Sequence, residues 1–369
     1  MLSQLVTDKY SDEPLVKKGL YIFLILAAFT LSGFFVTISL AQSTQGDIKI
    51  GLLVRDKKDI SLINTAKLAM ESANSQGGYK GRSIGLEFRS CDGPWGVGSK
   101  MAVDLIHSEN VLLVVAALDG RNAHLAEQVA AKSHIVLLDA LASDPTLSRA
   151  YVPWYYRMVP DDKQQAETLM EEIYLRKRAT RVAMVSLDNY DGKMAATTFF
   201  YLVKARGLPE PQLLSGTDDK QLTEKIAKGS WDAILIAGTS AKDPLLNDLI
   251  ASAGNTPIFA FQNIYNFLQV THPALERVLC PRVTGFKQAS WADFEKRYKE
   301  KYNESPSPSM AYVYDAIMLA IEAVRKFGPD SQVIKEGFKS LKYQGITGPV
   351  VFGSLGNREM EFSFNYPPR

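Results

Sequence analysis

The sequence predicts an α/β protein of two lobes, each built around a parallel sheet covered by helices. Short apolar runs rich in β-branched residues alternate with segments of helical periodicity, as parallel strands and crossover helices do. The alternation occurs in two successive series, and 369 residues exceed the size of one typical domain. These two observations indicate a chain with two sheets.

Residues 111–147 show the alternation most clearly. The run VLLVVAAL at 111–118 is typical of a buried parallel strand, and the polar turn Asp119-Gly120-Arg121-Asn122 follows it. Helical spacing over 123–132 leads to a second buried strand, IVLLDA, which the residues Ala142-Ser143-Asp144-Pro145 end. In an open α/β sheet, ligands bind beyond the carboxyl ends of the strands. We therefore expect both polar loops at one functional edge.

The first series begins with the apolar strand IKIGLLV and surrounds the stretch just described. Gly77 and Gly78 stop its first helix, and the alternation of Ile84, Leu86 and Phe88 predicts a strand. In order, the expected elements before residue 111 are a strand at 48–54, a helix at 62–74, a strand at 82–89 and a helix at 100–108.

The second series repeats this build, with the apolar runs RVAMVSL, WDAILIAG and PIFAF as its strands. Its expected helices cover 164–177, 193–206, 222–228 and 244–253, and its expected strands cover 181–187, 209–214, 231–238 and 257–261. A charged helix at 291–302, a long apolar helix at 310–327 and two short strands, VVF and EFSF, complete the chain.

The N-terminus predicts export. Lys17 and Lys18 precede a nearly uninterrupted apolar run at 20–41, which is long enough to span a bilayer. The run ends in Ser39-Leu40-Ala41, which fits a signal-peptidase site before Gln42. Residues 1–41 are therefore a signal peptide or an N-terminal membrane anchor, with the cleaved signal favoured. On either alternative the charged flank places the remainder outside the cytoplasm, and we expect a periplasmic location.

Composition and motifs argue against catalysis. A net charge of +2 gives no reason to expect nucleic-acid binding, and the four histidines lack metal-ligand spacing. The GxxxxG run at 93–98 precedes Ser99-Lys100, the reverse of the P-loop order, and no GxSxG is present. Asp188 and Asp191 are interpreted as a solvated turn rather than paired catalytic carboxylates. We predict no enzyme activity, no metal and no cofactor.

Polar or small residues follow each of the strands expected to face a cleft. Hydroxyls, amides and loop N–H groups can bind a carboxylate, and a tyrosine can cover an apolar moiety. Two sheets with such edges form a clamp for a small molecule when they face one another. The strand ends concerned are Arg55-Asp56, Asp119 to Asn122, Ala142-Ser143, Asp188-Asn189-Tyr190, Thr239-Ser240 and Gln262-Asn263.

Four segments together resemble the type I periplasmic binding proteins, and specifically the leucine/isoleucine/valine-binding branch. They are IKIGLLV, NSQGGYKGRSIGLEFRSCDG at 74–93, IVLLDALASDPTLS at 135–148 and YYRMVPDDKQQAETL at 155–169. The resemblance covers residues 48 to about 366. It implies two Rossmann-like lobes joined by three crossovers, with lobe one at 48–160 plus about 286–345 and lobe two at 161–285 plus about 346–369.

The resemblance implies an extracytoplasmic solute-binding protein that delivers its ligand to an ABC permease of the inner membrane. The ligand would be an amino acid or a related small carboxylate, held in the cleft between the lobes without a cofactor. The alternative is a membrane-anchored sensing or accessory module of the same fold with no transport role. The ligand-binding positions that the family resemblance implies are Gly120, Arg121, Asn122, Ala142, Ser143, Tyr190, Thr239 and Gln262.

Departures from the family pattern bear on the ligand. Gly120 stands where a hydroxyl is usual, and Gln262 is neutral where an acid usually pairs with the α-ammonium group. Asp119 or Asp188 would have to replace that acid. Arg55 and Arg121 would add two cations near the cleft, so either the ligand is unusual or more acidic, or amino-acid binding has been lost.

The two cysteines, Cys91 and Cys280, are expected on different lobes, and a disulfide between them is the less favoured alternative. The resemblance also implies that the usual disulfide of lobe one is absent, because Asp119 occupies the position of the partner of Cys91.

Overall fold

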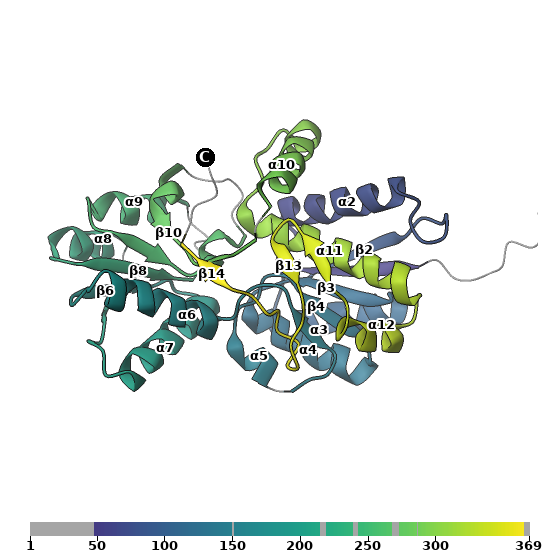
Figure 1. Cartoon of the computed structure of the whole chain (residues 1–369), viewed down its shortest axis with the longest axis horizontal. Helices are drawn as coiled ribbons and strands as arrows, with labels where there is room; N and C mark the ends of the chain where they lie inside the picture. The colour runs from purple at the N-terminus through teal and green to yellow at the C-terminus, as the bar shows by residue number, and fades with distance from the viewer. Residues whose placement is uncertain are drawn as a thin grey trace, which may run out of the picture. The chain divides into compact units, whose positions relative to one another are not determined.

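The computed structural model describes residues 48–149, 151–214, 219–238, 243–267, 273–285 and 287–364 (Figure 1). The predicted signal or anchor at 1–41 and the strand end Thr239-Ser240 lie outside these ranges. The chain divides into two units, Met1–Asp47 and Ile48–Arg369, and both sheets belong to the second unit. Within the described ranges, no helix has both the length and the apolar character that a membrane crossing requires.

The first sheet consists of five parallel strands in the order β2-β1-β3-β4-β5. The central strands β1 and β3 are almost completely buried, as the β-branched apolar runs predicted. We call this sheet and the helices on it lobe one. Its strands are β1 (Lys49–Val54), β2 (Gly85–Ser90), β3 (Leu113–Ala117), β4 (Val136–Asp139) and β5 (Tyr155–Arg157).

Helices cover both faces of the lobe-one sheet. The long apolar helix α11 (Pro308–Phe327) is buried against one face beside α2 (Ile60–Ser75) and α12 (Ser331–Phe338), and α10 (Gln288–Tyr302) packs on α2. The other face carries α3 (Val97–Val103), α4 (Gly120–Ser133) and α5 (Pro145–Arg149). The C-terminal part of the chain thus completes lobe one.

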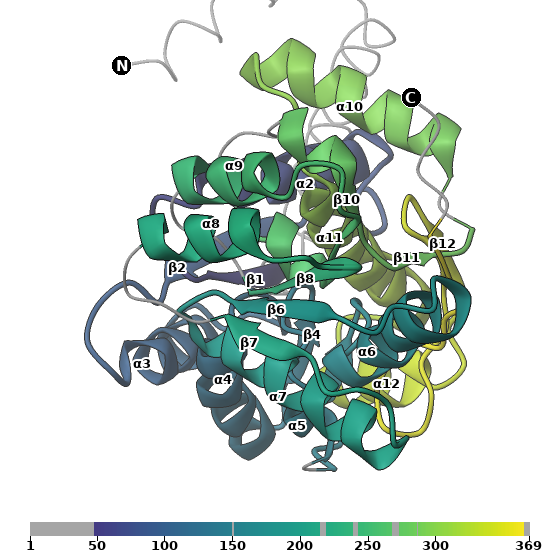
Figure 2. The ribbon, with the colours of Figure 1, turned by 90° about the vertical axis from the view of Figure 1, so that its left-hand side faces the viewer.

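The second sheet also has five parallel strands, in the order β10-β9-β8-β6-β7. We call it and its helices lobe two. Figure 2 shows α8 and α9 on one side of this sheet and α6 and α7 on the other. The strands are β6 (Val182–Ser186), β7 (Gln212–Leu214), β8 (Ala233–Ala237), β9 (Ile258–Ala260) and β10 (Val278–Leu279), and the helices are α6 (Asp162–Met170), α7 (Tyr190–Ala205), α8 (Asp219–Lys228) and α9 (Asp243–Ser252).

Three chain segments connect the lobes, and hydrogen bonds tie them together. The first runs beyond β5, the second contains β11 (Arg282–Val283), and the third follows β12 (Tyr343–Gly345) and β13 (Gly348–Val350) towards β14 (Phe362–Ser363). β11 pairs with β14 in antiparallel fashion, and the amide of Arg157 donates to the carbonyl of Gly356 at 2.9 Å. The predicted fold class, with two parallel sheets and three crossovers, is confirmed. The exact lobe boundaries remain a prediction.

The side chain of Arg358 joins two of the crossovers. It is fully buried, and its guanidinium donates to the carbonyl of Pro349 at 2.9 Å, to the hydroxyl of Thr347 at 2.9 Å and to its carbonyl at 2.8 Å. A longer bond of 3.4 Å reaches the carbonyl of Met158 on the first crossover. The buried Asp315 of α11 accepts the amides of Ile346 and Thr347, both at 2.8 Å. This network links the first crossover, the third crossover and α11.

The predicted helices and the main strands form close to their predicted bounds. The expected helices at 100–108 and 164–177 end as the π-helical segments Asp104–Ser108 and Glu171–Arg176. Both cysteines are free and buried, Cys91 in the core of lobe one and Cys280 in that of lobe two. The structure therefore places them as predicted, on different lobes and without a disulfide.

Candidate functional site

The helix N-termini that follow β3 and β6 face each other across the two lobes. Asp119 caps α4 by accepting the amide of Asn122 at 2.8 Å, and Asn189 caps α7 by accepting the amide of Gly192 at 2.9 Å. These caps place Gly120 and Tyr190 in the first turns of facing helices. The structure thus brings together two of the predicted ligand-binding positions.

Two hydrogen bonds connect the lobes at this place, and we call them the interlobe latch. The amide of Gly120 donates to the Asp191 carboxylate at 2.9 Å, and the Tyr190 hydroxyl donates to the Asp144 carboxylate at 2.6 Å. The carboxylate of Asp191 thereby takes the backbone N–H expected to bind a ligand. In this arrangement the protein's own acids satisfy the donors at Gly120 and Tyr190.

Asp191 corrects one interpretation of the sequence. The turn at 188–191 was interpreted as solvated, and the side chain of Asp188 is indeed 83% exposed. Asp191 is only 4% exposed, because α7 packs its first turn against α4. Burial, together with the nearby charge of Asp119, raises the pKa of Asp191 to about 7.

Asp144 is the centre of the latch on lobe one. Its carboxylate accepts from the hydroxyl and the amide of Thr146, at 2.7 and 2.8 Å, and its second oxygen lies 3.0 Å from Nε2 of His124. Burial raises the pKa of Asp144, but the bonds from His124, Tyr190 and Thr146 outweigh it and lower the pKa below its ordinary value. Asp144 is therefore a stable carboxylate that holds both lobes.

His124 is charged at neutral pH in this setting. Its bonds to Asp144 and then to Glu127 raise its pKa from 6.5 to about 9, although burial opposes the rise. Because the pKa is higher in the folded state, the stabilisation is fully present below pH 6.5 and is lost as pH rises through about 9.

Replacement of His124 by glutamine should reveal this pH dependence. We expect the difference in melting temperature between the wild type and His124→Gln to be largest near about pH 6 and to vanish by about pH 10. Thermal unfolding followed by circular dichroism measures it. The exposed His107, which contacts the Ser133 hydroxyl, supplies the control His107→Gln. A difference that does not change with pH would contradict the ion pair.

Gly120 is required by space rather than by backbone conformation. A Cβ atom at this position would lie 2.9 Å from Cε1 of Tyr190 and 3.1 Å from both Cβ of Asp144 and Oδ1 of Asp191. We predict that Gly120→Ala destabilises the closed arrangement by about 1–3 kcal/mol, as overpacking does. Urea unfolding measures the loss, and Gly120→Ala/Tyr190→Ala should recover part of it. The contact would be refuted if Gly120→Ala lowered the free energy of unfolding by the same amount in the wild type as in the Tyr190→Ala variant.

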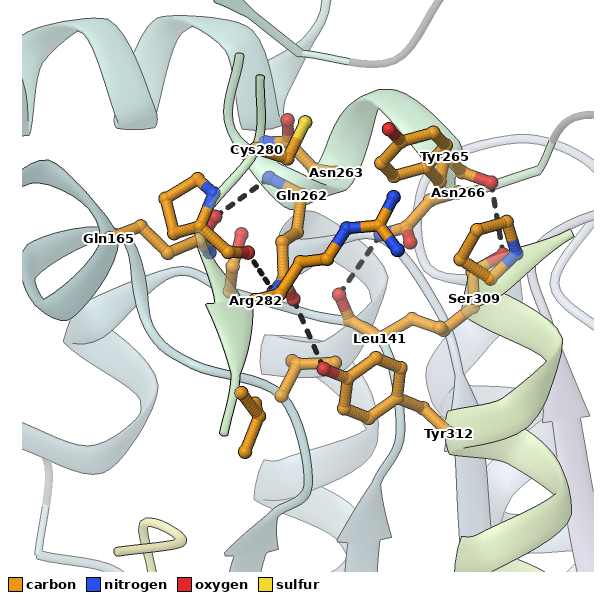
Figure 3. Close-up of a pocket in the computed structure, with 15 residues that line it drawn as sticks. Leu141, Gln165, Gln262, Asn263, Tyr265, Asn266, Cys280, Arg282, Ser309 and Tyr312 are labelled. Atoms are coloured by element: carbon orange, nitrogen blue, oxygen red, sulfur yellow. Dashed lines mark hydrogen bonds between the residues drawn. The ribbon is translucent and has the colours of Figure 1, made fainter. Parts of the chain in front are cut away.

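A cavity of about 50 Å³ lies on the crossover side of the latch. The carboxyl ends of β4 and β9 converge on it, and β11 and the start of α11 close it (Figure 3). Its space is enough for a few water molecules. The lining residues are Leu141, Ser143, Val159, Gln165, Gln262, Asn263, Tyr265, Asn266, Cys280, Pro281, Arg282, Val283, Pro308, Ser309 and Tyr312.

Ser143 and Gln262 are the predicted site residues that line this cavity. The amide of Gln262 donates to Oε1 of Gln165 at 2.7 Å, and its side-chain nitrogen donates to the carbonyl of Pro281. The Tyr312 hydroxyl donates to Oε1 of Gln262 at 3.4 Å. Gln262 therefore connects lobe two with α11 of lobe one at the cavity wall.

The remaining predicted positions lie elsewhere. Arg121 stacks on the ring of Trp95, with its guanidinium carbon 4.2 Å from the ring centroid. The side-chain amide of Asn122 donates to the Asp119 carboxylate. Ala142 is buried, and its backbone amide donates to the Asp139 carboxylate at 2.9 Å. Thr239 lies outside the described residues. In the described part of the chain, no three His, Cys, Asp or Glu side chains are grouped so that they could hold a metal ion.

Sequence reasoning missed Arg282, Asn263 and Tyr312 as cavity residues. Asn263 had been noted only as a polar strand end, and Tyr312 lies in a helix whose pattern indicated burial. Arg282 lies on a strand of two residues, which is too short for a periodic signal. The charge of Arg282, in a stretch that links the lobes, was the sequence feature that could have indicated a cavity residue.

A model of the periplasmic binding protein family matches residues 48–361. The chain belongs to this family. The match confirms the resemblance to type I periplasmic binding proteins, which form a family of binding proteins.

One curated relative of this chain is a branched-chain amino acid binding protein. The Leu/Ile/Val-binding protein BraC3 of Rhizobium johnstonii is 24% identical over 230 residues, which cover 59% of this chain and 62% of that protein. The match therefore spans less than two thirds of the length of the curated relative.

Solved structures of similar proteins confirm the fold. The substrate-binding protein LivJ of Streptococcus pneumoniae, solved with isoleucine, gives a TM-score of 0.70 at 18% identity over 85% of this chain and 94% of that one. A solute-binding protein of Rhodopseudomonas palustris, solved with 3,4-dihydroxybenzoic acid, gives a TM-score of 0.72 at 17% identity. The match covers 86% of this chain and 92% of that one. Proteins of this fold thus include binders of amino acids and of aromatic acids.

Proposed function

We propose that this protein is the extracytoplasmic solute-binding protein of an ABC importer and that it binds a small carboxylate between its two lobes. The observation that carries the proposal is the cavity on which the strand ends of both lobes converge. Ser143 reaches it from lobe one, Gln262 from lobe two, and Arg282 from a crossover. A ligand at this position would contact both lobes and the connection between them, and would favour their closure.

The size of the cavity indicates how binding proceeds. A volume of about 50 Å³ accommodates one polar group of a ligand but not a whole amino acid or aromatic acid. The ligand therefore enters when the lobes separate, which requires the interlobe latch at Gly120 and Tyr190 to open. Hinge closure of this kind is the signal that a permease can read.

A thermal-shift screen of the exported protein tests the proposal. The probes are L-leucine, L-isoleucine, L-valine and 3,4-dihydroxybenzoate, which represent the ligand classes of the relatives. We expect saturable stabilisation by at least one of them, because a ligand at a hundred times its Kd adds about 2.7 kcal/mol. No stabilisation by any probe at millimolar concentration would contradict the proposal.

The proposed location is the periplasm, and the proposed partner is an ABC permease of the inner membrane. Both rest on the predicted export segment at 20–41 and on family membership. N-terminal sequencing of the exported protein should find Gln42 as the first residue. A mature chain that keeps residues 20–41 would instead favour the membrane-anchored sensing or accessory module.

A further inference from the structure

We propose that Arg282 and Asn263 form the anion-binding site for the carboxylate of the ligand, and that the ligand is a carboxylic acid with no ammonium group beside the carboxylate. This inference rests on the proposed function and makes its ligand class more specific. It moves the carboxylate from the turn at Gly120, where the family resemblance implied it, to the crossover side of the cleft.

The charge of the cavity favours an anionic ligand. Arg282 is the cation among the lining residues, and none of them is an aspartate or glutamate. In the described part of the chain, no carboxylate forms an ion pair with the Arg282 guanidinium. A guanidinium in a partly buried pocket that has no carboxylate partner among the described residues is suited to a bidentate carboxylate.

The Arg282 guanidinium is positioned to reach a ligand in the cavity. Figure 3 shows the Arg282 side chain extending from β11 between Gln262 and Tyr312, with its guanidinium directed towards Tyr265 and Asn266. Burial raises the pKa of Tyr265, whereas the charge of Arg282 opposes this rise. The guanidinium therefore lies beside the Tyr265 hydroxyl, inside the cavity.

The cavity also offers a second donor, the side-chain amide of Asn263. Asn263 is 2% exposed and lines the same cavity, and its Nδ2 has no hydrogen-bond partner among the described residues. Its Oδ1 accepts the amide of Gly238 at 3.2 Å, which fixes the orientation of the side-chain amide. An unpaired buried donor is unfavourable, and a bound carboxylate oxygen would remove that penalty.

The ammonium group of an amino acid lacks a matching partner here. At Gln262 the chain is neutral, and the side chain is already bonded to Pro281 and Tyr312. Asp162 adjoins the cavity, since its amide donates to the carbonyl of Ser143 at 2.7 Å. Its carboxyl group is fully buried, and burial raises its pKa well above the ordinary range, which favours the neutral acid. An α-ammonium beside Arg282 would be repelled without compensation.

Isothermal titration calorimetry of the exported protein tests the anion site and the absence of an ammonium group from the ligand. The probes are 4-methylpentanoate, which is leucine without its ammonium group, L-leucine, 3,4-dihydroxybenzoate and the neutral 4-methylpentanamide. We expect 4-methylpentanoate or 3,4-dihydroxybenzoate to bind at least about 30-fold more tightly to the wild type than to Arg282→Gln. We also expect 4-methylpentanoate to bind more tightly than L-leucine.

Matched variants separate this inference from the proposed function and from misfolding. Arg121→Gln removes a cation outside the cavity and should leave the affinity for the carboxylate unchanged. Arg282→Lys should recover part of the affinity that Arg282→Gln loses. Circular dichroism checks that Arg282→Gln is folded. Equal affinity of folded Arg282→Gln and wild type for a carboxylate, or tighter binding of L-leucine than of 4-methylpentanoate, would overturn the inference while the proposed function stands. Binding of no probe to the wild type at millimolar concentration would overturn both.

Discussion

Replacing Arg358 by alanine is expected to lower the free energy of unfolding by about 3–5 kcal/mol, as loss of one partner from a buried charged network does. The guanidinium is fully buried, and it bonds Thr347 and Pro349 on one crossover and reaches Met158 on another. Its removal leaves these acceptors unpaired and takes a positive charge from the neighbourhood of Asp315. Urea unfolding followed by circular dichroism measures the loss.

Two variants control the Arg358 experiment. Arg121→Ala removes an exposed arginine that stacks on Trp95, and we expect its effect to stay within about 0.5 kcal/mol. Arg358→Lys keeps the charge but not the fork of donors, so it should recover only part of the stability. An Arg358→Ala protein that unfolds at the wild-type urea concentration would show that the crossovers are held together by other contacts.

Replacing Asp144 by alanine is expected to weaken both folding and lobe closure. Asp144 is 1% exposed, and its carboxylate bonds to His124 and Thr146 of lobe one and to Tyr190 of lobe two. We expect the free energy of unfolding to fall by about 3–5 kcal/mol, because His124 and Tyr190 lose a buried charged partner. Small-angle X-ray scattering should show a larger radius of gyration, since one bond of the latch is gone.

The exposed Asp188 gives the matched control for Asp144. Its side chain is 83% exposed and pairs with Lys193 at 2.8 Å, so Asp188→Ala should change stability by no more than about 1 kcal/mol. Asp144→Asn keeps an acceptor for Thr146, so its free energy of unfolding should lie between those of the wild type and Asp144→Ala. An unchanged radius of gyration in Asp144→Ala would show that the latch does not hold the lobes together.

The sheets were predictable from the sequence because their signals are local. Runs such as the one that forms β3 are buried on both faces and read as continuous apolar segments. The helices between them show their own periodicity, so the order of elements was correct. The elements that were missed are β5, β10, β11, β12, α5 and α12. Most of these have two to five residues, too few for a period, and several form through partners far away in sequence.

The candidate site was predictable only in part, for the same physical reason. Parallel-sheet topology alone places Ser143 and Gln262 at strand ends, and the structure finds both at one cavity. The pairing of Gly120 with Asp191, 71 positions apart, depends on how α4 and α7 meet. Arg282 reaches the cavity from a crossover whose path no local pattern encodes. Side chains brought in by the connection between lobes are therefore the ones that sequence reasoning misses.

The most direct test of the account is a crystal structure of the exported protein with a carboxylate that binds in the calorimetric titrations, 4-methylpentanoate being the first to try. The account predicts the ligand between the lobes, beside Ser143 and Gln262, with its carboxylate on the guanidinium of Arg282 and on Nδ2 of Asn263. A ligand whose carboxylate instead lies on the amide of Gly120, with Arg282 out of contact, would contradict the proposed anion site. A ligand bound outside the cleft would contradict the account as a whole.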